Sequence, residues 1–546
     1  MKKTNSDPES DKNLFLFAIL IFSSVWIYKL IPIVTKFILT HKYYFGTGLS
    51  LVLTAIIVLI KNRLIQIKQK NDAKHILQRE SENSFFIGTS YDGKDIFLPE
   101  SSRTKHTQVV GTTSSGKTES VIIPWSIQDI KKGRGFIIID GKSDRSLVDK
   151  LYAYAVKYKR SKDFRLFSLV NIEESDTYNP LAGGSPDEVA ERVFSSFDFE
   201  NEYYRNIQYE FFKQTLSIFY KSNLVPTFVK LIKVISDASL LYELALKTKD
   251  SLLIQWAARV KSLSRETLEE RTSGLVNQLS HFASSETAKL FNSEHPSIDI
   301  EKAMSEGLIL YFQLPVLKTP TLGKATGKML LQNIQSAVSS RHLDKDKNVP
   351  LFSIFLDDFS EYLTPSFVSL LNKSRSANVG VVFAHQALGD LETLGDAIKN
   401  TILTNSNIKV FMRTNENESA EYFAKTCGTQ TGTKTTDRQT KGTFGSEKTG
   451  DGSIREVEEF IYHPNTFKKE LATGEAIMVV PFHKNVTTVR INLEMAEDLP
   501  TQKLPIIIKP DPLEIVGSSN SKTMNEKLTR ISSSKTDIDR ATERAS

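Results

Sequence analysis

Apolar and polar positions divide the chain into three kinds of segment. Two long uncharged runs lie near the amino terminus, short apolar runs recur from residue 85 onward, and residues 185–296 carry apolar positions at helical spacing. Short, continuously apolar runs are typical of strands buried on both faces of a parallel sheet, whereas a 3.6-residue spacing is typical of amphipathic helices. The pattern predicts a membrane anchor and an α/β domain with an inserted all-α domain.

The two amino-terminal runs predict transmembrane helices at about 14–35 and 44–60, within an anchor at 1–62. Lys29 alone interrupts the first run, which approaches the ~20 residues that span a bilayer. Lys61, Arg63 and further basic residues follow the second run, so both termini and the bulk of the chain are expected on the cytoplasmic side. The alternatives are a cleaved signal peptide, although no small-residue cleavage site is present, and a buried soluble helix.

Strand-like runs on both sides of the helical segment predict one α/β domain. Runs at 85–89 and 95–99 flank a turn and predict a hairpin. Further strands are expected at 106–110, 136–140, 164–168, 307–312, 351–357, 379–384 and 408–412, with sheet-edge strands at 475–480 and 485–491. Helical segments separate most of these strands, which is the order of βαβ units.

Domain boundaries follow from changes in this pattern. Ser185 opens a capping box with Glu188, and the helical pattern continues to about residue 294. We predict 63–184 and 297–500 as two parts of a nucleotide-binding domain, 185–296 as the all-α domain, and 501–546 as a flexible polar tail. The polar stretch at 428–455 is expected to form an exposed loop or hairpin.

The sequence Gly-Thr-Thr-Ser-Ser-Gly-Lys-Thr at 111–118 has the spacing of a phosphate loop. Its glycines let backbone N–H groups converge on phosphate oxygens, Lys117 is expected to reach the outer phosphates, and Thr118 to ligate Mg²⁺. The alternative is a chance Gly/Ser-rich turn, which the complete pattern between a strand and a helix disfavours. The expected nucleotide-binding residues are Gly111, Thr112, Thr113, Ser114, Ser115, Gly116, Lys117 and Thr118.

Asp357 and Asp358 end an apolar strand, as the acidic element of a phosphate-loop enzyme must. We expect Asp357 to hold Mg²⁺ through its water shell and Asp358 to orient or deprotonate the attacking water. Gln386 follows another buried strand and is a candidate sensor of the γ-phosphate; a plain polar strand end is the alternative.

Charge and cysteine content narrow the class of partner only slightly. The formal net charge of +6 is compatible with a nucleic-acid or membrane partner. Cys427 is the single cysteine, which excludes an intramolecular disulfide, and no Cys/His cluster has zinc-site spacing.

Several motifs join the phosphate loop in an order that is more specific than any one of them. They are Phe136 to Asp140, Tyr178 to Leu181, Leu356 to Phe359, Ser374 to Val381 leading to Gln386, and Phe411 to Asn415. With the predicted anchor and helical insertion, the chain resembles the type IV secretion coupling proteins, the VirD4/TraG/TraD group within the HerA/FtsK class. The resemblance implies a RecA-like P-loop domain with an inserted all-α domain, ATP as the nucleotide, and a homohexameric ring at the bacterial inner membrane.

The resemblance also implies a function. Such a ring hydrolyses ATP to move single- or double-stranded DNA without reading its sequence, and it recruits relaxase and relaxosome proteins to components of the secretion channel. An arginine of this family reaches the nucleotide of the neighbouring subunit, a position that Arg375 matches best and Arg413 second best. Asp358 departs from the family, where glutamate is frequent, so Glu361 is an alternative or assisting base.

Two other functions are compatible with the sequence. The first is a coupling receptor for protein effectors without DNA movement, and the second is a membrane assembly protein that binds nucleotide as a switch. The paired acids and Gln386 favour hydrolysis over a passive switch.

Overall fold

The computed structural model describes residues 83–199, 201–284, 286–343, 349–442, 445–482 and 485–509. All of them belong to the second of two compact units, Met1–Arg79 and Glu80–Ser546. The predicted spans at 14–35 and 44–60, and the tail from residue 510 onward, lie outside the described residues. Among the described residues, no helix has the length and apolar character needed to cross a membrane.

One eleven-stranded mixed sheet organises the described chain, in the order β2-β1-β13-β12-β9-β3-β8-β7-β4-β6-β5. The strands from β9 to β5 pair in parallel, and those from β2 to β12 pair antiparallel. Their bounds are β1 Ser84–Ser90, β2 Asp95–Pro99, β3 Thr107–Val110, β4 Phe136–Asp140, β5 Phe164–Ser168, β6 Ile309–Gln313, β7 Phe352–Asp357, β8 Val379–His385, β9 Ile408–Phe411, β12 Glu475–Phe482 and β13 Asn485–Leu493.

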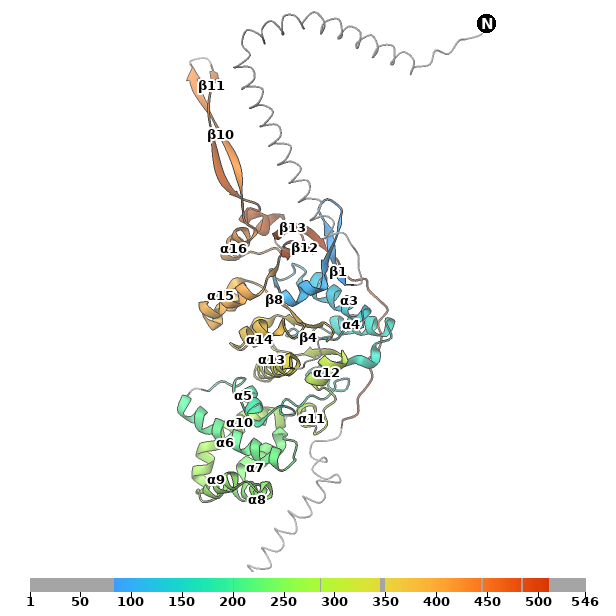
Figure 1. Cartoon of the computed structure of the whole chain (residues 1–546), viewed down its shortest axis with the longest axis vertical. Helices are drawn as coiled ribbons and strands as arrows, with labels where there is room; N and C mark the ends of the chain where they lie inside the picture. Colours follow the sequence, from blue (N-terminus) through green and yellow to red (C-terminus); the bar gives the residue numbers. More distant parts are fainter. Residues whose placement is uncertain are drawn as a thin grey trace, which may run out of the picture. The chain divides into compact units, whose positions relative to one another are not determined.

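The parallel strands are buried on both faces, as their apolar runs predict. Every residue of β3, β4, β6, β7, β8 and β9 is buried. Helices α3 (Ile123–Lys131) and α4 (Arg145–Lys157) lie on one side of the sheet, and α13 (Pro320–Leu343), α14 (Phe367–Ser374) and α15 (Asp396–Asn405) on the other (Figure 1). This arrangement confirms the predicted α/β class, although α15 was not predicted.

The prediction that the strands near 475–480 and 485–491 lie at the edge of the sheet is wrong. β12 is bordered by β9 and β13, and β13 pairs on its other side with β1. The physical reason is the predicted hairpin β1–β2, which joins the same sheet and covers β13, leaving β2 at the edge. Pairing between segments about four hundred residues apart leaves no mark on local periodicity.

The helix after the phosphate loop begins with a wide π-helical turn, η2 (Thr118–Ile122), and continues as α3. Pro124 lies in the first turn of α3. Proline lacks the N–H that would bond four residues back, and a wider turn is one way in which a helix accommodates that loss.

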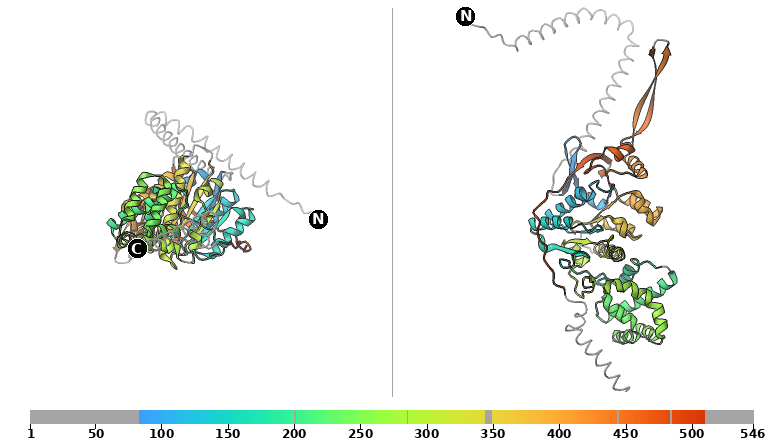
Figure 2. Two further views of the ribbon diagram at one scale, coloured as in Figure 1. Left: turned by 90° about the horizontal axis from the view of Figure 1, so that it is seen from below. Right: turned by 180° about the vertical axis from the view of Figure 1, so that it is seen from behind.

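The described part of the inserted segment contains helices and no strand, as predicted (Figure 2). Its helices are α5 Pro186–Phe194, α6 Glu202–Lys221, α7 Phe228–Ser236, α8 Ala238–Thr248, α9 Ser251–Lys261, α10 Arg265–Ala283 and α11 Ala288–Phe291. A side-chain oxygen caps the amino terminus of each of the first six, at Ser185, Asn201, Thr227, Asp237, Asp250 and Ser264. A cap of this kind contributes about 1 kcal/mol, so the helix starts are encoded locally.

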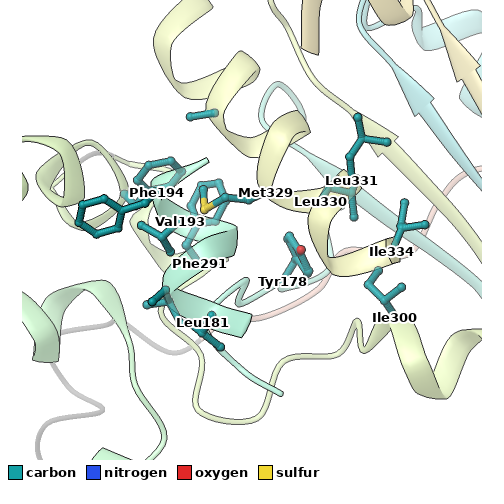
Figure 3. Close-up of a cluster of buried hydrophobic side chains, with 14 of the residues drawn as sticks. Tyr178, Leu181, Val193, Phe194, Phe291, Ile300, Met329, Leu330, Leu331 and Ile334 are labelled. Carbon is teal, nitrogen blue, oxygen red and sulfur yellow. The ribbon is translucent and has the colours of Figure 1, made fainter. Parts of the chain in front are cut away.

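The helical segment shares a continuous apolar core with the sheet domain. Phe194 of α5 and Phe291 of α11 lie toward Met329 and Leu330 of α13, with Tyr178 beside them (Figure 3). The segments that enter and leave the insertion run together, since Tyr178 and Ile298 form a parallel bridge. Helix α12 (Ile300–Glu306) then leads back into β6.

Two peripheral segments complete the described chain. The polar stretch after α16 (Asn417–Cys427) forms a separate antiparallel hairpin of β10 (Thr429–Gly442) and β11 (Gly445–Phe460), which confirms the expected loop or hairpin as a hairpin. Residues 501–509, expected in the flexible tail, contact the sheet domain: Leu504 is buried and the Ile507 N–H donates to the Glu173 carbonyl at 2.9 Å.

Candidate nucleotide-binding site

Residues 111–118 form a loop between the carboxyl end of β3 and the helix that follows. Ser114 and Gly116 have left-handed backbones, with φ of 63° and 99°. A Cβ at Gly116 would also lie 3.1 Å from the Gly474 nitrogen, so both conformation and space favour glycine there. Two backbone hydrogen bonds hold the loop to neighbouring segments: the Thr112 N–H donates to the Arg413 carbonyl at 2.8 Å, and the Gly474 N–H donates to the Ser115 carbonyl at 3.0 Å.

The backbone N–H groups at the crest of the loop are open. Those of Thr113, Ser114, Gly116 and Lys117 have no hydrogen-bond acceptor among the described residues. Thr113 and Ser114 are exposed, whereas Ser115 is buried. Successive unpaired N–H groups at the start of a helix form an anion-binding nest, which fits a polyphosphate.

The Lys117 side chain is buried in its own loop, with 5% of its surface exposed. Its ammonium donates to the Gly111 carbonyl and, at 3.2 Å, to the Thr112 carbonyl. Burial, and next the charge of Lys142, lower the pKa of Lys117. Two neutral carbonyl groups do not neutralise this charge, so a phosphate group would be a better partner for it.

Thr118 and Asp357 bring two hard oxygen ligands together. The Thr118 hydroxyl donates to Asp357 Oδ2 at 2.7 Å, although 239 residues separate them in the chain. Asp357 is 1% exposed, and burial raises the pKa of its carboxyl group. No group of three or more His, Cys, Asp or Glu side chains suited to a metal occurs among the described residues. The pair fits Mg²⁺, which usually completes its shell with waters and phosphate oxygens.

Asp358 is held in a strained position next to this pair. Its backbone is left-handed, with φ of 46°, and its Oδ1 is buried without a hydrogen-bond partner in the described chain. Oδ2 lies 2.9 Å from the Lys142 ammonium. A non-glycine residue in this conformation costs of order 1–3 kcal/mol, and such strain is frequent at functional sites. Glu361, the alternative base, pairs with Lys324 at 3.0 Å.

Sequence reasoning missed Lys142, which lies in the loop after β4. Asp140 organises that loop: its carboxylate accepts N–H bonds from Lys142, Ser143 and Asp144 and a hydroxyl bond from Tyr311 at 2.8 Å. Burial raises the pKa of Asp140 to about 6. β4 pairs with β7 so that Asp140 lies opposite Asp357, and this register delivers Lys142 to Asp358. The acidic strand end at residue 140 was the available signal.

Gln386 lies at the carboxyl end of β8, next to β3 in the sheet. Its side chain is exposed, and its N–H donates to Asp390 Oδ2 at 2.7 Å. The preceding residue, His385, is buried, and its carbonyl accepts the Gly111 N–H at 3.3 Å. Gln386 therefore borders the phosphate loop.

The two candidate arginines lie at opposite ends of the strands. Arg413 follows β9 and its carbonyl holds the Thr112 N–H, so it borders the phosphate loop of its own chain. Arg375 ends α14 before β8 begins, and its charge contributes, after burial, to lowering the pKa of His106 to about 4. The structure therefore brings together Lys117, Thr118, Asp357 and Asp358 and does not bring Arg375 to them within one chain.

A cavity of about 710 Å³ lies away from the phosphate loop, where the two linkers of the helical segment meet α13. Arg192 lines it, is 1% exposed, and donates to the Pro180 carbonyl at 2.6 Å. Burial lowers the pKa of Arg192. The cavity belongs to the junction of the two domains and not to the candidate nucleotide site.

This chain is similar to known coupling proteins in sequence and in fold. Residues 352–471, from β7 to the segment before β12, match a family model described as the TraM recognition site of TraD and TraG. The chain is 23% identical over 485 residues to the type 4 coupling protein DotL of Legionella pneumophila, a match that covers 78% of this chain and 61% of DotL. The chain thus spans less than two thirds of the length of this relative.

Solved structures of the plasmid coupling protein TrwB share the fold. The unbound form of the conjugative coupling protein TrwBdeltaN70 superposes with a TM-score of 0.57 at 12% identity, and the match covers 80% of this chain and 94% of that solved chain. TrwB in complex with ADP and Mg²⁺ gives 0.52 at 13% identity, covering 79% and 93%. The matched family segment, the relative along most of the chain and the shared fold all make this chain similar to type IV coupling proteins.

Proposed function

We propose that this protein is an inner-membrane ATPase that couples a DNA–relaxase substrate to a type IV secretion channel and drives DNA transfer by ATP hydrolysis. The observation that carries the proposal is the contact at 2.7 Å between Thr118 of the phosphate loop and Asp357 of β7. It joins a phosphate-loop residue to an acidic strand end 239 residues away, the pairing that a phosphate-loop ATPase needs. Solved TrwB complexes with ADP and Mg²⁺ and with an ATP analogue support the choice of cofactors.

The residues of the site have separate roles in this proposal. The open N–H groups of the loop and Lys117 would bind the phosphates, while Thr118 and Asp357 would hold Mg²⁺, which would neutralise charge on the phosphate oxygens. Asp358 orients the attacking water and accepts its proton, water oxygen bonds to the γ-phosphorus, and ADP leaves with the bond electrons. Gln386 contacts the γ-phosphate or the water.

A ring completes the site in this proposal. Arg375 lies at the amino ends of the strands, away from its own phosphate loop, so it would serve the nucleotide of a neighbouring subunit in a homohexamer. Such an arginine stabilises charge on the transferred phosphoryl group. The predicted anchor at 1–62 would hold the ring at the membrane, with both termini and the ATPase domain cytoplasmic.

The test is ATP hydrolysis by the full-length protein in lipid nanodiscs, with and without single- and double-stranded DNA of unrelated sequences. We expect DNA of any sequence to stimulate hydrolysis, with a stimulation that falls steeply as salt increases. Lys117→Ala should abolish hydrolysis, whereas the matched control Lys131→Ala, an exposed lysine of α3, should not change it.

Each contrary outcome selects another function. Hydrolysis that no DNA stimulates would favour a receptor for protein effectors. Nucleotide binding without hydrolysis, together with transfer that survives in Lys117→Ala, would favour a nucleotide-switched assembly protein.

A further inference from the structure

Three buried polar side chains form a continuous chain beneath the phosphate loop. Lys409 of β9, Gln108 of β3 and His385 of β8 lie on adjacent strands, and none is more than 5% exposed. Lys409 Nζ is 2.8 Å from Gln108 Oε1, and Gln108 Nε2 is 2.9 Å from His385 Nε2. The nucleotide-binding mechanism proposed above uses none of the three side chains.

Lys409 is fully satisfied and can only donate. Its ammonium also donates to the Leu403 carbonyl at 2.6 Å and to the Ser406 hydroxyl at 2.9 Å. The Ser406 hydroxyl gives its own proton to the Ile402 carbonyl at 2.8 Å, so Lys409 must supply all three protons. No carboxylate pairs with this ammonium in the described part of the chain. A buried charge held only by neutral acceptors is costly and indicates a positional requirement.

Lys409 determines the direction of the hydrogen bonds that run from it through Gln108 to His385. Because Lys409 can only donate, the oxygen of Gln108 must face it, and the amide NH₂ must face His385. His385 Nε2 is then an acceptor, so the imidazole proton resides on Nδ1, which donates to the Ala387 carbonyl at 2.7 Å. The fold therefore selects one tautomer of a neutral His385.

His385 in turn holds two parts of the nucleotide site. Its carbonyl accepts the N–H of Gly111, the first residue of the phosphate loop, at 3.3 Å. Its Nδ1–H bond fixes the turn at Ala387, and within that turn the N–H groups of Gln386 and Ala387 both donate to Asp390 Oδ2, at 2.7 and 3.1 Å.

We propose that Lys409 and Gln108 are positioning residues for ATP hydrolysis: they impose the Nδ1–H tautomer of His385, and His385 thereby holds the Gln386 turn in place against the phosphate loop. This inference rests on the proposed ATPase function. It assigns a role to buried residues that touch neither nucleotide nor water.

The charges around His385 agree with a neutral imidazole. Burial lowers the pKa of His385 to about 4, and the ammonium groups of Lys117 and Lys409 act in the same direction, whereas the Ala387 bond and the Asp390 carboxylate oppose them. Burial also lowers the pKa of Lys409 to about 7, although its three acceptors favour the ammonium form.

The first test measures backbone amide exchange in the full-length protein and does not depend on hydrolysis. In Lys409→Met the amide of Gln108 is free to flip, so peptides that contain Gly111 and 385–390 should exchange about tenfold faster than in the wild type. Lys425→Met, an exposed lysine of α16, is the matched control and should leave these peptides unchanged.

The second test uses Gln108→Glu, a substitution of nearly equal size that changes which protonation state of His385 can hold the turn. In Gln108→Glu a carboxylate faces His385 Nε2, so the turn is held only when the imidazole carries both protons. We expect kcat for ATP close to wild type near pH 6 and about tenfold lower near pH 8, with KM little changed, a loss typical of outer-shell partners. The fall should exceed any change that the wild type shows over the same range, in which the Lys409 amine itself titrates, and Gln502→Glu, an exposed glutamine, is the control.

The outcomes separate the two proposals. Wild-type exchange in Lys409→Met together with a wild-type pH profile in Gln108→Glu would overturn the positioning role. If the wild-type protein hydrolyses no ATP, the proposed function fails, and the exchange measurement still decides whether Lys409 holds the turn.

Discussion

The amino and carboxyl ends of the central strands differ in how completely their charged groups are paired. At the amino end, Arg103 of η1 (Glu100–Lys105) and Asp129 of α3 form a bidentate pair at 2.8 and 2.9 Å, 1% and 0% exposed, with the guanidinium near the rings of Phe85, Trp125 and Phe355. At the carboxyl end, Lys117 donates to carbonyl groups, while Asp358 Oδ1 and the loop N–H groups have no hydrogen-bond partner within the described ranges.

The difference distinguishes a structural charge from a functional one. At the amino end the chain supplies both the cation and the anion, so the charges of Arg103 and Asp129 neutralise each other and the pair joins η1 to α3. At the carboxyl end the phosphate loop leaves its N–H groups open to a ligand, and the protein bears the cost of holding like charges such as Asp357 and Asp358 together. Substitutions at the amino end should therefore change stability, and those at the carboxyl end should change activity.

The largest effect is expected from breaking the buried ion pair of Arg103 and Asp129. Asp129→Ala leaves the Arg103 guanidinium buried without its carboxylate and should lower the free energy of unfolding by about 3–5 kcal/mol. Chemical denaturation of the full-length protein measures this loss. The double variant Arg103→Met/Asp129→Leu should recover most of it, because apolar side chains suit the ring-lined site. A double variant as unstable as Asp129→Ala would show that the pair is needed for more than charge compensation.

A substitution at the carboxyl end of the strands should instead lower activity without lowering stability. Asp357→Asn removes a buried charge beside Asp358, so the thermal midpoint should stay the same or rise. Hydrolysis should fall about 10²–10³-fold, equal to about 2.7–4 kcal/mol, as when a group that stabilises transition-state charge is lost. Scanning calorimetry and steady-state ATPase assays measure the two effects. A clear loss of stability would show that Asp357 is a structural residue like Asp129.

Asp140 should make stability depend on pH at the open end. Its pKa is about 6 in the folded protein, above the ordinary aspartate value of 3.8, so between these values the folded chain binds more protons than the unfolded chain. Stability should therefore fall as pH rises from about 4 to 6 and level off above, with at most about 3 kcal/mol from this group. Asp357, whose pKa is also raised by burial, acts in the same direction.

Tyr311→Phe isolates the contribution of Asp140, because the substitution removes the hydroxyl that donates to the Asp140 carboxylate. Loss of this hydrogen bond should raise the pKa of Asp140 further. Denaturation curves across this range should show the plateau begin at a higher pH in the variant than in the wild type. Superimposable curves for the two proteins would exclude Asp140 as the group responsible.

The smallest effect is expected at Lys142, which orients Asp358 from the neighbouring strand. Lys142→Met should lower kcat for ATP about tenfold and leave KM nearly unchanged, as expected for an outer-shell partner. Steady-state kinetics measure both constants, with Lys131→Met as the exposed control. A rise in KM without a fall in kcat would instead place Lys142 on the nucleotide phosphates.

Local signals account for what the sequence predicted correctly. Continuous apolar runs predict the buried parallel strands, six capping side chains lie at the helix starts of the insertion, and the glycine spacing predicts the phosphate loop. Each of these features depends on residues within a few positions of one another, so one segment contains its own evidence.

Tertiary structure alone decided which distant segments meet. Sequence by itself predicted that Lys117 and Asp357 belong to one kind of site, because Lys117 lies in a phosphate-loop motif and Asp357 at an acidic strand end. It did not determine that β1 covers β13, that Lys142 reaches Asp358, or that Lys409 acts through Gln108 on His385. Those contacts follow from strand order and register, and these depend on burying the apolar surface of the whole sheet, which no local pattern specifies.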